Sequence, residues 1–166
     1  MVAVKGAILS LLRDAYIRRD RIGLLVFRKK RADLILPPTS SVELGEKLLT
    51  ELPTGGRTPL SLGILRGYDI LRQEAMKNPN ISPLMVLISD GRANVSLYGK
   101  DPVKEAKEVA SMLRMGDIPT VVIDPTDGFL NLGIAKELAD VLGARYFKLG
   151  DLSAETITGS ILSLHP

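Results

Sequence analysis

The fold of this chain is decided by the stretch Leu84-Met85-Val86-Leu87-Ile88-Ser89-Asp90-Gly91. Its apolar residues follow one another without alternation, as in a parallel strand that is buried on both faces. The run stops at an acidic residue and a glycine, so such a strand would carry the Asp90 carboxylate at its carboxyl end. Ligands of open α/β folds bind outside the carboxyl ends of the strands. The stretch therefore predicts a central parallel strand over residues 83–89, with Asp90 at the binding edge.

Helical and strand patterns alternate on both sides of this stretch. Helices are expected at residues 2–19, 40–52, 59–76, 101–115, 130–142 and 153–164, and further strands at 21–27, 32–36, 118–124 and 144–149. The short basic connection Arg28–Arg31 predicts a hairpin, which makes the strand at 32–36 an antiparallel edge strand that ends at Pro37-Pro38. The alternation predicts one doubly wound α/β domain over residues 1–166, with a mostly parallel sheet and helices on both faces.

Local signals mark several helix ends. Ser40 or Ser41 is expected to cap the second helix, and Ser40 would form a capping box with Glu43. Asp101 and the proline after it open a later helix, for which Gly116 is the expected C-cap.

A second motif precedes Asp90 in the sequence, Thr54-Gly55-Gly56-Arg57-Thr58-Pro59. A Thr58 hydroxyl beside the Asp90 carboxylate would offer the hard oxygen ligands that suit Mg²⁺ or Mn²⁺. Plainer interpretations stay open, since Thr58 could cap the next helix without any metal and Asp90-Gly91 could be a simple turn. The motif lacks the spacing and the lysine of a nucleotide-binding P-loop.

Composition narrows the kinds of site that this chain can build. There is no cysteine, and the one histidine is His165. Thiolate sites and disulfides are therefore excluded, and histidine-ligated zinc and Ser-His catalysis are disfavoured. No apolar run approaches the roughly 20 residues of a membrane span, and no secretory leader is recognised, so a cytoplasmic protein is expected.

The charge is mildly basic, at +3, and is concentrated at Arg18–Arg21 and Arg28–Arg31. Aromatic residues make up 4% of the chain, and none is interleaved with these clusters as a base-stacking surface requires. The clusters are expected to be solvated, with docking to an acidic protein partner as the alternative and no binding of nucleic acid.

The two motifs together resemble two of the three parts of the metal-ion-dependent adhesion site of von Willebrand factor type A domains. In that family the threonine and the Asp of the Asp-Gly turn help to hold one divalent ion, which implies Thr58 and Asp90 as the ligands here. Asp124, at the end of a strand on the same edge, is expected either to cap a loop or to orient a metal-bound water.

The third part of that site, an Asp-x-Ser-x-Ser motif at the end of the first strand, would lie upstream of Met1. The sheet is therefore expected to lack a central strand between those at 21–27 and 83–89, which would leave a slot about 9.6 Å wide. The halves would have to close, another chain would have to fill the slot, or the natural protein would begin upstream. With this part missing, Mg²⁺ or Mn²⁺ is expected to bind weakly or not at all.

Wider segments resemble the C-terminal type A domain of the D subunit of magnesium chelatase, or its cobaltochelatase equivalent. These segments are 3–12, 18–24, 36–39, 52–60, 90–95 and 123–129. The resemblance implies a non-catalytic interaction domain of a complex that inserts Mg²⁺ or Co²⁺ into a tetrapyrrole. An AAA+ motor subunit and a large catalytic subunit are the expected partners, and a partner carboxylate would complete the metal coordination.

Two other functions stay open. One is a type A scaffold or adhesion domain of an unrelated complex. The other is a Mg²⁺-dependent phosphoryl enzyme that uses Asp90, which is disfavoured because one Asp and one Thr lack a base and a charge clamp.

Overall fold

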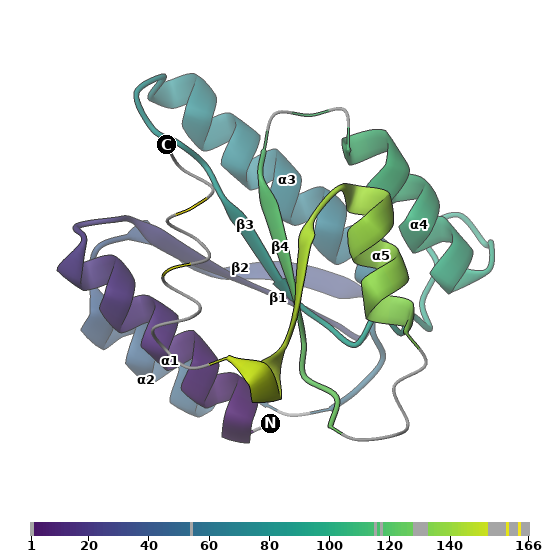
Figure 1. The fold of residues 1–166 in the computed structure, drawn as a ribbon, viewed down its shortest axis with the longest axis horizontal. Coiled ribbons are helices and arrows are strands. Elements are labelled where there is room, and N and C mark those ends of the chain that lie inside the picture. Colours follow the sequence, from purple (N-terminus) through teal and green to yellow (C-terminus); the bar gives the residue numbers. More distant parts are fainter. Residues whose placement is uncertain are drawn as a thin grey trace.

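The structure is a computed structural model, and it describes residues 2–53, 55–114, 116, 118–127, 133–152, 159 and 163. The helices are α1 (Val2–Ile17), α2 (Val42–Glu51), α3 (Leu60–Lys77), α4 (Pro102–Leu113) and α5 (Ile134–Leu142). The strands are β1 (Ile22–Arg28), β2 (Arg31–Thr39), β3 (Met85–Ile88), β4 (Thr120–Asp124) and β5 (Arg145–Lys148), and a 3-10 turn, η1 (Leu149–Asp151), follows β5. Figure 1 shows their arrangement.

Strands β3, β4 and β5 form a parallel sheet in that order. The β3 side chains alternate between two helical layers. Met85 and Leu87 join the core cluster under α3, α4 and α5, whereas Val86 packs against Leu11 of α1. Helices therefore cover both faces of the parallel sheet, and the predicted α/β class is confirmed.

Strands β1 and β2 form a separate antiparallel hairpin, as the basic turn predicted. The predicted end of the second strand at Pro37-Pro38 was wrong, because β2 continues to Thr39. Ile22 pairs with Thr39 and Leu24 pairs with Leu36, so both prolines lie where the register shifts. A proline has no amide proton to donate, and an irregular edge strand does not need one at that point.

No strand pairing joins β1 to β3 within the described part of the chain, so the sheet is divided where a central strand was expected to be missing. Helix α3 spans the division on one face. A Cβ at Gly63 would lie 2.5 Å from the Phe27 ring, and one at Gly67 would meet Met85 and Leu25 at 3.3 and 3.7 Å. Small residues thus let α3 pack closely against both sheets.

The helix caps follow most of the local signals. Ser41, not Ser40, caps α2, and its Oγ accepts a hydrogen bond from the Leu44 amide at 3.4 Å, so the capping box expected of Ser40 does not form. Asp101 caps α4 as predicted, but α4 ends at Leu113, earlier than expected. Apart from residues 159 and 163, the helix predicted at 153–164 lies outside the described residues, as does the predicted start of another at 130. None of the described helices combines the length and apolarity of a membrane span.

Candidate metal-ion site

Asp90 lies at the carboxyl end of β3, where the sequence predicted it. The Ser89 amide donates to the Ile123 carbonyl at 3.0 Å and so extends the sheet by one residue. The Asp90 side chain is 33% exposed, and its Oδ1 accepts the Arg92 amide at 2.9 Å. Its Oδ2 lies 3.8 Å from Arg92 Nε, a distance too long for a hydrogen bond. One carboxylate oxygen therefore shapes the turn, and within the described part of the chain the other makes a single loose contact.

Gly91 is required by the packing of this turn. Its φ is +78°, in the left-handed region that favours glycine. A Cβ at this position would lie 2.6 Å from the Ala135 amide nitrogen in the first turn of α5. The Asp-Gly turn is thus held against the start of α5.

Thr58 reaches the same edge from a different segment. Its amide donates to Asn94 Oδ1 at 2.7 Å, and the Asn94 amide donates to the Thr58 carbonyl at 3.2 Å. A reciprocal pair of hydrogen bonds therefore joins Thr58 to the loop that follows Asp90. The alternative in which Thr58 caps the helix was wrong, because the N-cap of α3 is Pro59 and no side chain caps it.

Asp124 is fully buried at the end of β4. Its Oδ1 accepts hydrogen bonds from the amide and the hydroxyl of Thr126, and its Oδ2 accepts one from the Tyr146 hydroxyl at 2.9 Å. The carboxylate thus holds the turn after β4 against β5. Its predicted role in orienting a metal-bound water remains a prediction.

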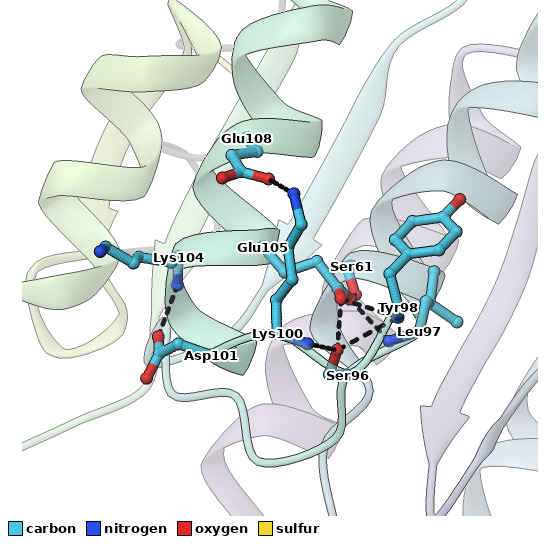
Figure 2. A network of polar contacts seen from close by, with 9 residues as sticks. All are labelled: Ser61, Ser96, Leu97, Tyr98, Lys100, Asp101, Lys104, Glu105 and Glu108. Carbon is cyan, nitrogen blue, oxygen red and sulfur yellow. Dashed lines mark hydrogen bonds and ion pairs between the residues drawn. The ribbon is translucent and has the colours of Figure 1, made fainter.

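A buried carboxylate that sequence reasoning missed fixes the remainder of the loop that follows Asp90 (Figure 2). Glu105 of α4 is 1% exposed, and its two oxygens receive four hydrogen bonds. The donors are the hydroxyls of Ser61 (2.5 Å) and Ser96, and the amides of Leu97 (2.7 Å) and Tyr98 (3.0 Å). Glu105 therefore ties the first turn of α3 to the loop that begins at Asp90.

The position of Glu105 explains its protonation state. Burial by itself raises the pKa of this carboxyl, but the hydrogen bonds from the Leu97 amide, the two serines and the Tyr98 amide outweigh burial and lower the pKa to about 2. A signal for it was present in the sequence. Glu105 lies on the apolar face of α4 with Val109, one turn away, where a lone charge needs several donors.

The residues at this edge form a partial donor set for a hard cation. No group of three or more His, Cys, Asp or Glu side chains that could hold a metal occurs among the described residues. Mg²⁺ prefers oxygen ligands of the kind that the Thr58 hydroxyl and Asp90 Oδ2 offer. The Thr58 hydroxyl is not used as a helix cap. These residues fit an ion whose other ligands are waters or a carboxylate from another molecule.

The chain has relatives of known sequence, although no family model matches it. It is 47% identical to an uncharacterised protein of Methanocaldococcus jannaschii over 165 residues, covering 99% of this chain and 94% of that protein. It is 38% identical to the magnesium-chelatase 67 kDa subunit of Chlorobaculum parvum over 175 residues, covering 98% of this chain. The match spans 28% of that subunit's length.

Solved structures share the fold at low sequence identity. BatB from Bacteroides thetaiotaomicron has a TM-score of 0.67 at 17% identity, covering 97% of this chain and 86% of BatB. The SpRpn10 VWA domain has a TM-score of 0.64 at 12% identity, with coverages of 96% and 82%. Proximal thread matrix protein 1 from the mussel byssus, solved with zinc in its metal-ion-dependent adhesion site (MIDAS) motif, has a TM-score of 0.58 at 17% identity, with coverages of 98% and 41%. The chain therefore has the fold of von Willebrand factor type A domains and is homologous to part of the magnesium-chelatase 67 kDa subunit.

Proposed function

We propose that this chain is a non-catalytic docking domain of a metal-chelatase complex, and that it binds its partner through a divalent ion held by Thr58 and Asp90. The expected partners are an AAA+ motor subunit and a large catalytic subunit that inserts Mg²⁺ or Co²⁺ into a tetrapyrrole. A cytoplasmic location is part of this proposal. The homology to chelatase subunits supports the type of complex.

The observation that carries the proposal is the reciprocal hydrogen-bond pair between Thr58 and Asn94. Asn94 lies four residues after Asp90, so this pair holds the threonine loop against the loop that carries the carboxylate. This connection supports a site to which the two segments would contribute one oxygen ligand each. A mussel protein of the same fold was solved with a zinc-occupied MIDAS motif, which supports a divalent ion in this proposal.

A divalent ion, when bound, would act as a bridge between carboxylates. Thr58 contributes a neutral hydroxyl and Asp90 a charge, which leaves the ion with net positive charge and open positions. A carboxylate of the partner is the ligand that best neutralises this charge and fills an open position, since Mg²⁺ prefers oxygen donors and octahedral geometry. With two ligands from this chain, binding of Mg²⁺ or Mn²⁺ by the chain alone is expected to be weak or absent.

The alternative functions differ in what they require. A scaffold or adhesion domain of an unrelated complex would use the same site with a different partner. A phosphoryl enzyme would need a general base and cationic groups around the phosphate. In the described part of the site, no histidine is present to act as the base.

The test is docking with and without metal. Asp90→Ala should abolish the Mg²⁺-dependent capture of the motor or catalytic subunit, and Thr58→Ala should weaken it less, because a hydroxyl binds a divalent ion less strongly than a carboxylate. Asp69→Ala, an exposed aspartate on α3, is the matched control. Each pull-down is run with Mg²⁺ and with EDTA, beside a thermal melt. Undiminished docking by Asp90→Ala would remove the metal bridge.

A further inference from the structure

The tip of the β1–β2 hairpin lies against the threonine loop of the candidate site. The Lys29 amide donates to the Arg57 carbonyl at 2.7 Å. Lys29 has a φ of +57°, which turns the chain sharply at this point, and its Cγ lies 4.0 Å from where a Cβ of Gly56 would be. The hairpin tip and the loop that leads to Thr58 are therefore neighbours, although they are far apart in the sequence.

Three exposed cations meet at this junction, Lys29 and Lys30 from the hairpin and Arg57 from the loop. None of them forms an ion pair within the described part of the chain, although many other cations do. Those that pair with a carboxylate include Arg13, Arg18, Arg21, Arg31, Lys77, Lys100, Lys107 and Lys136. The junction thus adds Arg57 to the basic cluster that the sequence indicated and removes Arg31, which is paired with Asp33.

We infer that Lys29, Lys30 and Arg57 form a basic docking surface for an acidic segment of a partner protein, beside the Thr58–Asp90 edge. The position follows from the structure, because Arg57 immediately precedes Thr58. An acidic segment fits on charge, since each carboxylate that it brings finds a cation without a competing internal partner. The location of this acidic segment rests on the proposed function, because a segment that supplies a carboxylate to the ion would extend over these cations.

An acidic protein is favoured over nucleic acid by the surroundings of these cations. Single-stranded nucleic acid needs aromatic side chains on which its bases stack. The nearby Phe27 is only partly exposed, and its ring packs against Gly63 of α3. The surface therefore offers charge without a stacking platform.

The charge contact can be measured without metal. The probe is a fluorescein-labelled polyglutamate peptide, followed by anisotropy in EDTA at about 0.01 M ionic strength, where the Debye length is about 30 Å. The double variant Lys30→Glu/Arg57→Glu should bind the peptide about tenfold more weakly than the wild type. Raising the ionic strength to about 0.15 M should weaken the wild type by a similar factor, because exposed charges are then screened.

The control variant is Arg72→Glu. It reverses one charge, where the double variant reverses two, on an exposed residue twelve residues after Leu60, which is about 18 Å along α3. Equal weakening by Arg72→Glu, or no loss in the double variant, would overturn the inference. Tighter binding of a single-stranded oligothymidylate with the same dependence on these cations would also overturn it, in favour of nucleic acid.

The outcome can be separated from that of the proposed function. Asp90→Ala should leave the peptide affinity in EDTA unchanged or slightly raised, because a negative charge is removed from the edge. If capture of the partner subunit proves independent of Mg²⁺ but still falls in the Lys30→Glu/Arg57→Glu variant, the metal bridge fails and the basic surface stands. If capture depends on Mg²⁺ and is unaffected by the double variant, the basic surface fails and the metal bridge stands. Thermal melts of all variants test whether the fold is kept.

Discussion

Replacing Glu105 with glutamine should destabilise the protein far more than an exposed glutamate on the same helix would. The Glu105 carboxylate accepts four hydrogen bonds, two on each oxygen. An amide keeps one acceptor oxygen and places an NH₂ group where the other oxygen was. Two hydrogen-bond donors would then face the new NH₂ group, which is itself a donor, at a position where Glu105 is 1% exposed.

The size of the effect can be worked in two ways. Two hydrogen bonds to a charged group are worth about 1.5 kcal/mol each at the low end, which gives about 3 kcal/mol. Expressed through protonation, the same hydrogen bonds lower the pKa of Glu105 from 4.5 to about 2. Since each pH unit corresponds to about 1.4 kcal/mol, this difference again amounts to about 3 kcal/mol. A loss of that size corresponds to a fall in Tm of about 6–12 °C in a chain of this length.

The pH dependence has a definite sign. The pKa of Glu105 is lower in the folded protein than in the unfolded chain, so its contribution is complete above about pH 4.5 and is lost as the pH falls towards 2. The difference in stability between the wild type and Glu105→Gln should therefore be largest near pH 7 and should shrink between pH 4.5 and 2. Urea unfolding followed by circular dichroism at pH 7 and at about pH 3 measures both values.

The matched control is Glu108→Gln, on the next turn of the same helix. Glu108 pairs with Lys100 at 2.8 Å, and both side chains are 56% exposed, so its loss should change the free energy of unfolding by less than about 1 kcal/mol. Similar effects of the two variants, or a Glu105→Gln effect that does not shrink at low pH, would refute the role assigned to the Glu105 carboxylate.

Three further predictions concern stability. Gly91→Ala should lower the free energy of unfolding by at least about 3 kcal/mol, because it adds a backbone clash to a positive φ. Gly55→Ala, at a similar φ of +81° with open space around it, should lower it by about 1 kcal/mol. Urea titrations of the two variants side by side isolate the effect of the clash. Tyr146→Phe should cost about 1–3 kcal/mol by removing a hydrogen bond to buried Asp124, measured by thermal melting. Ser41→Ala should cost about 1 kcal/mol through loss of the α2 cap, and near-wild-type stability would contradict that cap.

Much of the fold was predictable because its signals are local. The unbroken apolar run at β3 and the alternation of helices and strands indicated the parallel α/β architecture. Boundary errors occurred where tertiary context decided the outcome. The prolines of β2 were read as a strand end, but an edge strand with a shifted register accommodates them. The end of α4 differs from the prediction for another reason. A glycine after a helix marks the helix end only approximately, and α4 ends at Leu113.

The sequence drew attention to Thr58 and Asp90, whose role as ligands remains a prediction, but not to the residues that support them. Thr58 and Asp90 stand out because their neighbours are glycines and a strand end. Asn94 does not stand out, because its importance depends on Thr58, which only the folded chain brings near. Glu105 is marked in the sequence by its place on the apolar face of α4, but its hydrogen-bond donors are not. A hydrogen bond between residues 36 apart, such as that of Thr58 with Asn94, leaves no periodic trace in the sequence.

The supports of the site are independent of any metal. The loop after Asp90 is held against α5 at Gly91, against the threonine loop at Asn94 and against α4 at Glu105, all through contacts within the chain. Ordering a loop costs about 1–2 kcal/mol per residue in backbone entropy, and these contacts meet that cost during folding. A bound ion would then act on a preformed edge, and its binding energy would go into holding a partner. This separation is why substitution of Asp90, whose side chain makes one hydrogen bond to its own loop, is expected to change docking far more than stability.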